Sequence, residues 1–497
     1  MIEKAPRWVL PGQEIEDIAE RLIQEHPMPP HFSRMLAIRG ISSLAEANAF
    51  INPSLSDLRD PFLMKDMGVA VGRLKEAMRT GEHIMVLGDY DVDGVCGTAL
   101  FYRVMTNLGM KVSYHVPDRF KEGYGVSREA VDRAIELGVK LVISVDSGIT
   151  AFEEADYVQK KGIDFIITDH HEPQANQLPS ALAVLDPKLP GSSYPFRDLA
   201  GVGVMFKLLQ ALYIDTDMDP ADLYDELDLV ALGTAADVVP LVDENRVLAR
   251  FGIDRMRNTA NTGLAALIEI SGAMKGRVNS SNIIYLLAPR LNAPGRLSSA
   301  SKTVDLLICE NWMRALEIAD DIEKENAVRR EMNDRVYTEA ERMIQELGHE
   351  AWTRGIVLAS SDWHQGVIGI AASRIVEKYY LPTVLISLEG EVGKGSARSI
   401  KEFDICGAMG ECENILDTYG GHKYAAGLSI RSERIEDFRC KFGEILCRDL
   451  PEGIPAPSIT IDSEIDFSYL NTHLINFLNK LAPFGENNPI PLFLTRN

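Results

Sequence analysis

The sequence has 497 residues, 46% of them hydrophobic, and a formal net charge of −22 from 51 basic and 73 acidic side chains. This length exceeds what a single hydrophobic core supports, so several domains are expected. The acidic balance excludes a surface that is basic overall and argues against a nucleic-acid partner, although a local groove could still bind phosphates.

Signals for membranes, secretion and disulfides are missing from the sequence. No stretch approaches the roughly 18 continuous apolar residues of a membrane span. The first residues lack the apolar core of a signal peptide, and the six scattered cysteines indicate neither a zinc site nor a disulfide framework. We therefore expect a cytoplasmic protein without membrane contact.

Residues 1–75 are predicted to be a helical lead-in, with an amphipathic stretch at 14–26 and proline breaks after it. From 76 to 300 the pattern alternates between apolar strands and helices, which predicts a parallel sheet with helices on both faces. Gly201-Val202-Gly203 is interpreted as the tight start of a helix and not as a nucleotide loop. The predicted strands are 83–87, 111–116, 139–145 and 163–168, and the predicted helices are 98–108, 127–138 and 152–161.

Three carboxylates follow the first strand at alternate positions: Asp89, Asp91 and Asp93. Carboxylates this close repel one another, and a divalent cation, which prefers oxygen ligands, relieves that repulsion. A metal site is therefore the first hypothesis, and an acidic surface turn is the alternative for this cluster taken alone. An EF-hand loop is excluded, because its twelfth position, counted from Asp89, is Leu100 and not glutamate.

Further metal-type ligands follow two more predicted strands and a helical stretch at 222–234: Asp146, Asp169, His170, His171 and Asp237. In open α/β sheets the carboxyl ends of the strands form the ligand-binding edge, so these side chains should converge there. Mixed carboxylate and imidazole ligation favours Mn²⁺, with Mg²⁺ as the alternative, and two ions would use this many ligands.

The rest of the chain predicts a second, smaller α/β unit. Residues 301–349 are predicted to form one or two long helices that connect domains. Residues 350–450 follow, with strands at 355–360 and 382–388 around a helix at 368–379. The Gly- and Ser-rich segment Gly393–Ser399 could bring backbone N–H groups and two cations to a phosphate, or it could be a flexible surface turn.

Eight stretches spread over nearly the whole chain resemble the RecJ family of DHH phosphoesterases. Four of them carry the acids and histidines described above, and four lie elsewhere. They are Asp89–Gly94, Val145–Gly148, Asp169–His171, Ala236–Leu241, Pro117–Gly125, Pro289–Arg296, Trp363–Gly369 and Gly420–Gly427.

This resemblance implies an α/β fold in which a parallel-sheet DHH catalytic domain at 76–300 is joined by a connecting helix at 301–349 to a DHH-associated domain at 350–450. Residues 451–497 would be a linker and the start of an oligonucleotide-binding barrel. Because the sequence stops at Asn497, we expect that barrel to be absent or truncated.

The resemblance also implies an activity. It is the metal-dependent 5′→3′ hydrolysis of single-stranded DNA in repair and recombination, with two Mn²⁺ or Mg²⁺ ions. The expected partners are a single strand with a 5′ end, a single-strand-binding protein and a helicase, and the expected state is a monomer. The implied metal ligands are Asp91, Asp93, Asp146, His170 and Asp237, with Asp89 ligating directly or through water, Asp146 as the bridging carboxylate and His171 beside a ligand or a phosphate.

By the same resemblance, the expected substrate-binding residues lie outside the acidic cluster. Arg119, Arg290, Arg296 and His422 would contact DNA, Tyr124 would stack on a base, and Ser396 and Arg398 would receive the 5′-terminal phosphate. For the lone Trp363, core packing is favoured over base stacking.

Two other functions use the same residues or their relatives. A DHH phosphodiesterase acting on cyclic dinucleotides or short oligonucleotides would need the same metals, whereas the 289–296 motif and the N-terminal extension favour the exonuclease. A non-catalytic replication scaffold would have lost ligands, and every expected ligand is present in this sequence.

Overall fold

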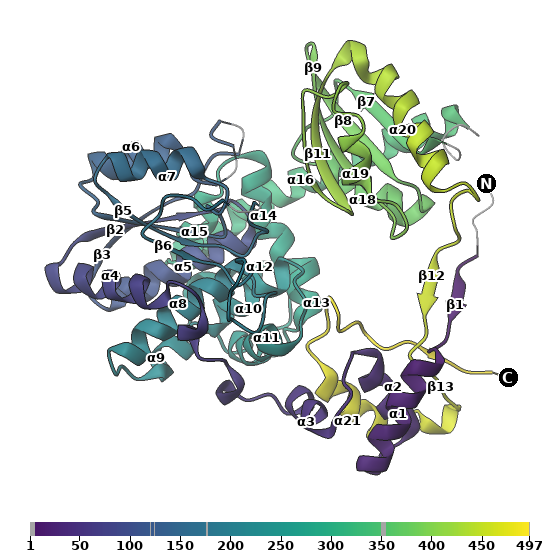
Figure 1. Cartoon of the computed structure of the whole chain (residues 1–497), viewed down its shortest axis with the longest axis horizontal. Helices are drawn as coiled ribbons and strands as arrows, with labels where there is room; N and C mark the ends of the chain where they lie inside the picture. Colours follow the sequence, from purple (N-terminus) through teal and green to yellow (C-terminus); the bar gives the residue numbers. More distant parts are fainter. Residues whose placement is uncertain (1–4, 120, 124, 175–176, 349–353, 497) are drawn as a thin grey trace. The chain divides into compact units, whose positions relative to one another are not determined.

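A computed structural model of the chain describes residues 5–119, 121–123, 125–174, 177–348 and 354–496. The chain divides into two compact units, which are described separately (Figure 1). The larger unit consists of Leu10–Asn326 and Ile461–Asn497, and the smaller unit consists of Met1–Val9 and Ala327–Thr460. The predicted boundaries differ from this division, because the first nine residues join the smaller unit and the C-terminal segment joins the larger one.

The larger unit is built on a five-stranded sheet in which every neighbouring pair is parallel. Side chains along each strand alternate between two cores: Ile84 and Val86 face one, and Met85 and Leu87 face the other. The sheet therefore needs a helical layer on each face, as the sequence predicts. In spatial order the strands are β3 (Lys111–His115), β2 (His83–Gly88), β4 (Leu141–Val145), β5 (Asp164–Thr168) and β6 (Ala183–Leu185).

Helices cover both faces of this sheet (Figure 1). One layer holds α6 (Arg128–Glu136) and α7 (Phe152–Lys160), whose apolar residues join the core of Met85 and Leu87. The other layer is thicker, and α8 (Gly201–Asp215) is buried along nearly its whole length, which fits its near-absence of charge. The other helices of this layer include α4 (Met67–Thr80), α5 (Val92–Asn107), α9 (Pro220–Tyr224), α10 (Leu227–Ala236), α11 (Asp243–Met256), α12 (Thr262–Ser271), α14 (Ala288–Leu297) and α15 (Ser301–Leu307).

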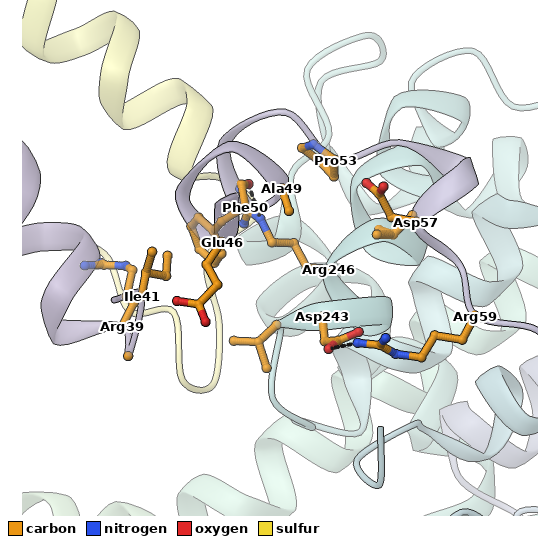
Figure 2. Close-up of a pocket in the computed structure, with 13 residues that line it drawn as sticks. Arg39, Ile41, Glu46, Ala49, Phe50, Pro53, Asp57, Arg59, Asp243 and Arg246 are labelled. Carbon is orange, nitrogen blue, oxygen red and sulfur yellow. Dashed lines mark hydrogen bonds and ion pairs between the residues drawn. The ribbon is translucent and has the colours of Figure 1, made fainter. Parts of the chain in front are cut away.

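The helical lead-in packs against the C-terminal segment of the chain. Phe32 stacks on Phe477 with the ring centroids 3.9 Å apart, and both belong to a separate apolar cluster. Arg246 of α11 joins this cluster to the sheet domain, donating to the carbonyls of Phe50 and Leu481 at 2.8 Å each (Figure 2). The helices concerned are α1 (Gln13–Glu25), α2 (Pro30–Ile38), α3 (Leu44–Ile51) and α21 (Thr472–Leu481), with the short strands β13 (Ser463–Glu464) and β14 (Phe493–Leu494).

The smaller unit contains a mixed sheet and confirms the second α/β unit of the prediction. The predicted strands and helix correspond to β7 (Ile356–Ser360), β8 (Thr383–Glu389) and α18 (Ile368–Tyr379). The sheet continues with three antiparallel neighbours in the order β10-β11-β9-β8-β7. The remaining elements are β9 (Val392–Arg398), β10 (Thr418–His422), β11 (Ala425–Arg431), α19 (Ile405–Gly410), α20 (Ile435–Asp449), and β1 (Arg7–Val9) paired with β12 (Ser458–Thr460).

The interpretation of Gly393–Ser399 as a phosphate-binding backbone loop is wrong. Residues 392–398 form β9, which pairs with β8 on one side and β11 on the other. Its backbone N–H groups are therefore used within the sheet, and only side chains of this strand can reach a ligand. The glycines fit the crowded sheet face, since a Cβ at Gly395 would lie 2.7 Å from the Leu428 side chain.

A long helix, α16 (Trp312–Leu347), runs across the division between the two units, and with α15 it confirms the prediction of two helices at 301–349. Within the described part of the chain, no helix is both long and apolar enough to cross a membrane.

Candidate metal centre

The acidic cluster lies where the strand order of the larger sheet reverses. From β2 the chain passes to β3 on one side and then to β4 on the other, so the carboxyl ends of β2 and β4 border a switch point. Such points are where open α/β sheets bind ligands. Asp89, Asp91 and Asp93 follow β2, and Asp146 follows β4.

The helix after β2 begins earlier than the sequence suggests. It starts at Val92 and not at 98, because the Asp91 carboxylate caps it by accepting hydrogen bonds from the N–H groups of Asp93 (2.9 Å) and Gly94 (3.1 Å). A Cβ at Gly94 would lie 2.6 Å from the backbone nitrogen of Asp89, so only glycine allows this turn to close. The alternating acids are thus held on a helix N-terminus.

All six predicted metal ligands come together at this edge. Their ligand atoms, with those of His171, form three overlapping groups in which every atom lies within 4.8 Å of the others. Asp146 and His170 each belong to two groups, which is the arrangement that two neighbouring cations require. The groups are Asp146 with His170 and His171, Asp93 with His170 and Asp237, and Asp89 with Asp91 and Asp146.

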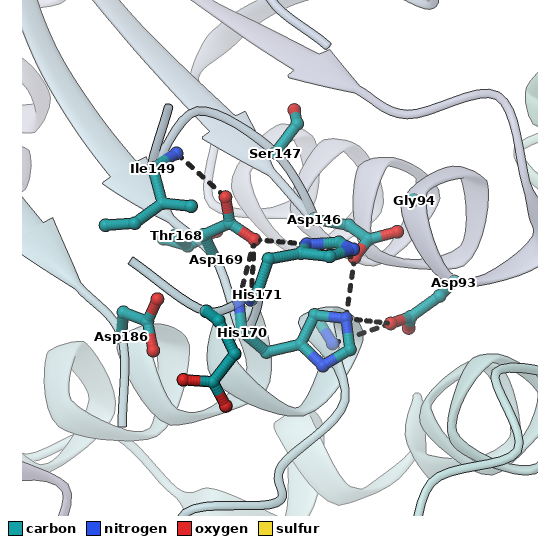
Figure 3. A network of polar contacts seen from close by, with 12 residues as sticks. Asp93, Gly94, Asp146, Ser147, Ile149, Thr168, Asp169, His170, His171 and Asp186 are labelled. Atoms are coloured by element: carbon teal, nitrogen blue, oxygen red, sulfur yellow. Dashed lines mark hydrogen bonds and ion pairs between the residues drawn. The ribbon is translucent and has the colours of Figure 1, made fainter. Parts of the chain in front are cut away.

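His170 faces three carboxylates from different elements (Figure 3). Its Nε2 lies 3.0 Å from Asp146 Oδ1, 3.6 Å from Asp237 Oδ2 and 3.9 Å from Asp93 Oδ2. Asp146 has a left-handed backbone with φ of 60°, and so does Val238, next to Asp237, with φ of 61°. Such conformations strain residues other than glycine and are concentrated at functional sites.

Burial makes this centre electrostatically costly without a cation. It raises the pKa of Asp89, Asp146 and Asp237 well above the ordinary range, and the neighbouring carboxylates raise them further. Burial and Asp91 raise the pKa of Asp93 to about 7, and burial and His171 lower the pKa of His170 to about 3. Asp89 Oδ1 is buried and has no hydrogen-bond partner among the described residues. A neutral imidazole among carboxylates is a ligand set that fits Mn²⁺ or Mg²⁺.

Asp169 orients both histidines, a role that the sequence did not predict. Its carboxylate accepts hydrogen bonds from the N–H groups of Ile149 (2.9 Å) and His170 (2.8 Å) and lies 2.7 Å from His171 Nδ1. Burial would raise the pKa of Asp169, but the contact with His171 outweighs it and lowers the pKa. Its place beside two histidines was the available signal.

The N-terminus of α8 also belongs to the centre. The N–H groups of Gly201 (2.6 Å) and Val202 (2.9 Å) donate to the Asp93 carboxylate. A Cβ at Gly201 would lie 2.6 Å from the Asp146 side chain, so this position must be glycine for the two elements to meet. The sequence identified the helix start correctly but not its part in the site.

Two of the predicted arginines lie beside the acidic cluster. The Arg119 guanidinium lies 5.2 Å from the centre of the Tyr90 ring. Burial raises the pKa of Tyr90, and the positive charges of Arg119 and Arg296 oppose that rise. Lys188, which the sequence did not single out, is close enough to lower the pKa of both His170 and Asp237, after the larger effect of burial on each.

Other predicted substrate residues have different surroundings. Arg290 is buried, with Nε 2.5 Å from Glu323 and Nη1 donating to the Leu286 carbonyl, so it holds α14 in place. Tyr124 lies outside the described residues. Trp363 is 4% exposed and donates to Glu339, which confirms core packing.

Ser396, Arg398 and His422 belong to the smaller unit. Arg398 Nη1 donates to Ser396 Oγ at 3.1 Å on β9. A Cβ at Gly369, in the first turn of α18, would lie 2.8 Å from Ser396 Oγ and 3.0 Å from Arg398, so these side chains adjoin the start of that helix. His422 is exposed on β10, at the edge of the sheet.

Comparison with known protein families matches most of the chain in three segments. The N-terminal domain of the DHH family matches residues 83–234, the DHHA1 domain matches 353–446, and the RecJ OB domain matches 461–497. The last match shows part of an oligonucleotide-binding domain in a segment where the sequence predicted an incomplete one.

The chain is similar along most of its length to curated exonucleases. It is 35% identical to the single-stranded-DNA-specific exonuclease RecJ of Salmonella typhimurium, over 94% of this chain and 83% of that protein. The chain belongs to the RecJ family. It is 39% identical to RecJ of Bacillus subtilis over its full length, but spans 62% of that protein. The crystal structure of Thermus thermophilus RecJ with Mn²⁺ matches with a TM-score of 0.84 at 29% identity, covering 100% of this chain and 70% of that one.

Proposed function

We propose that this RecJ-family chain is a metal-dependent exonuclease that degrades single-stranded DNA from the 5′ end. The observation that carries the proposal is the convergence of six carboxylate and imidazole ligands around Asp146 and His170. The similar proteins from Salmonella and Bacillus are named single-stranded-DNA-specific exonucleases, and a RecJ structure similar to this one was solved with Mn²⁺. Mn²⁺ or Mg²⁺ is therefore the proposed cofactor.

Two divalent ions in such a site supply an activated water and neutralise negative charge on the phosphoryl oxygens. Asp89, Asp91, Asp93, Asp146, His170 and Asp237 would hold them, with Asp146 shared between the two. Asp169 keeps His171 oriented toward the centre through the 2.7 Å contact at Nδ1, which leaves its Nε2 for a phosphate oxygen or the leaving group. No serine or cysteine nucleophile is needed.

The substrate strand would be held by cations beside the metal ligands. Arg119 and Arg296 flank Tyr90, directly after Asp89, and guanidinium groups match phosphate oxygens in geometry. In the smaller unit, Arg398 and Ser396 beside the first turn of α18 are proposed to bind the terminal 5′-phosphate, and His422 to contact the strand. A terminal phosphate carries nearly two negative charges, so such a group of donors favours a chain end over an internal phosphodiester.

The alternatives from the sequence find less support. A phosphodiesterase of cyclic dinucleotides would not account for the match of residues 461–497 to the RecJ OB domain. A scaffold would not need a complete and buried ligand set. We further propose a cytoplasmic monomer that acts in repair and recombination beside a single-strand-binding protein and a helicase, because these reactions generate the single strands it would consume.

The direction of degradation can be tested with Arg398→Ala on strands that carry a 5′-phosphate or a 5′-hydroxyl. Charge-assisted contacts contribute roughly 1.5–3 kcal/mol each, so binding of the phosphorylated strand should weaken by about 10- to 150-fold. Binding of the hydroxyl strand should change much less. The measurement is hydrolysis of end-labelled strands with Mn²⁺ or Mg²⁺.

The matched control is Arg431→Ala, an exposed arginine at the end of the neighbouring strand β11 whose charge loss is the same. It should leave both substrates unaffected. Equal losses on the two substrates for Arg398→Ala, or release of nucleotides from a 3′-labelled end first, would contradict the 5′ assignment.

A further inference from the structure

A cavity of about 570 Å³ lies in the larger unit where α11 meets the C-terminal segment. One wall comes from the end of α11 and the loop that leads to α13 (Ser280–Asn282), and the other from Asn479 at the end of α21 and the stretch through Phe484 to Ile490. Its volume is that of ordinary ligand sites. None of its lining residues belongs to the metal centre.

The charge of this lining is opposite to that of the whole chain. It contains three arginines, Arg250, Arg257 and Arg277, against a single carboxylate, Asp254. Asp254 pairs with both Arg250 (3.4 Å) and Arg257. Arg277 is exposed and makes no ion pair among the described residues. In a chain with a net charge of −22, this concentration of positive charge is unusual.

A buried cation on the same helix adds to it. Arg246 lies one helical turn before Arg250, is 2% exposed, and donates only to backbone carbonyls, those of Phe50, Lys480, Leu481 and Ala482. Burial lowers its pKa to about 9, and the positive charges of Arg250 and Arg39 lower it further. The arginines of α11 therefore repel one another, and an anion near Arg250 would relieve that repulsion.

The neighbouring cavity of about 500 Å³ in Figure 2 is a useful contrast. It also contains three arginines, but Glu46, Asp57 and Asp243 balance them, and Arg59 pairs with Asp243 at 2.5 Å. Positive charge is left without matching carboxylates only on the side of α11 that faces Asn479 and Phe484. That side is where an anionic ligand would bind.

We propose that this second cavity, formed by Arg250, Arg257, Arg277, Asn479 and Phe484, binds the phosphodiester backbone of single-stranded nucleic acid away from the metal centre. Guanidinium groups bind phosphates in a fixed fork geometry, and the half-buried Phe484 and the exposed Ile490 give the bases an apolar surface. The identity of the ligand rests on the proposed function, but the binding site does not include the hydrolytic residues. The site would anchor a strand independently of hydrolysis.

The test is binding of a 3′-fluorescein oligothymidylate of about 20 nucleotides by fluorescence anisotropy, in EDTA so that hydrolysis does not contribute. Arg277→Gln should weaken binding by about threefold and Arg250→Gln/Arg277→Gln by about tenfold. The double variant should lower the slope of log K against log salt concentration by about two, one for each lost phosphate contact. Asp254→Asn, which removes the one carboxylate, should tighten binding.

The matched control is Arg255→Gln, on the same helix but outside the cavity and paired with Asp225. Equal losses for Arg255→Gln and Arg277→Gln would show non-specific attraction and overturn the proposal, as would unchanged binding in the double variant. Loss of affinity for an acidic decapeptide with no loss for DNA would overturn it in favour of a protein partner. Selective loss of DNA binding in a wild-type chain that fails to hydrolyse single strands would support the site and contradict the proposed function.

Discussion

At the scale of single residues, Asp146 is the position on which the metal centre depends most. It belongs to two of the three ligand groups, lies 3.0 Å from His170 and adopts a left-handed backbone. A carboxylate shared by two cations cannot be replaced by a neutral amide without weakening both sites. Its identity as an acid should therefore matter more than its volume.

Asp146→Asn should reduce metal-dependent hydrolysis of single-stranded DNA by more than about 100-fold, because it removes the shared charge while keeping the side-chain shape. Circular dichroism should show an unchanged fold. Asp156→Asn, on the exposed side of α7, is the control and should keep full activity. An Asp146 variant that retains a tenth or more of wild-type activity would contradict the bridging role.

A second residue makes stability depend on pH. Burial, with a smaller contribution from Glu226, raises the pKa of Asp228 from 3.8 to about 6 against the opposing hydrogen bond from Thr259. Between about pH 4 and 6 the unfolded chain ionises at this position while the folded chain stays protonated. The folded state should therefore lose roughly 2–3 kcal/mol of stability from this group as the pH rises through that window.

Asp228→Asn should remove that part of the pH dependence, since the amide resembles the protonated acid. The measurement is the free energy of unfolding in urea across the same window, in EDTA, for the variant and the wild type. The control is Asp222→Asn, an exposed acid on the preceding helix, which should leave the profile unchanged. A variant whose stability falls with pH as steeply as that of the wild type would contradict the raised pKa.

At the scale of elements, the start of α8 sets the position of the bridging carboxylate. A Cβ at Gly201 would lie 2.6 Å from the Asp146 Cβ, whereas one at Gly203 would meet only the Leu199 side chain at 3.4 Å. Gly201→Ala should displace Asp146 and lower activity on the order of 100-fold, since misplacement by about 1 Å can cost that much. Gly203→Ala on the same turn is the matched control, with activity close to wild type. Similar losses in both variants would point to a general effect on the helix.

The elements also show what a sequence can and cannot reveal. Strand ends with acids or histidines could be predicted, because apolar runs and polar residues after them are local patterns. The start of α5 at Val92 could not, since it depends on Asp91 acting as a cap inside an acidic cluster. Gly393–Ser399 was mistaken for a loop because glycine and serine are rare in strands, and here they fit a face crowded by Leu428 and Ile386. The roles of Asp169 and Gly201 depend on contacts between segments distant in sequence.

At the scale of the whole molecule, every metal ligand belongs to the larger unit, and the smaller unit holds none of the ligand groups found among the described residues. A cation that binds the folded larger unit stabilises it by mass action, about 2.7 kcal/mol for one ion at 100 times its dissociation constant. The stabilisation should be confined to the elements that carry ligands. Hydrogen exchange can separate these elements from those of the smaller unit.

Addition of Mn²⁺ to the chelated protein should slow amide exchange in β2, β4 and β5 by about 100-fold, because their exchange requires an opening that loses the ion. Strands β8 and β9 of the smaller unit contain no ligand and serve as the internal control. Their exchange rates should not change, and Asp146→Asn should abolish most of the effect in the larger unit. Slower exchange in both sets of strands would mean that the metal acts on the whole chain. No change in either would mean that the converging carboxylates bind no cation, and the proposed hydrolysis would lose its chemical basis.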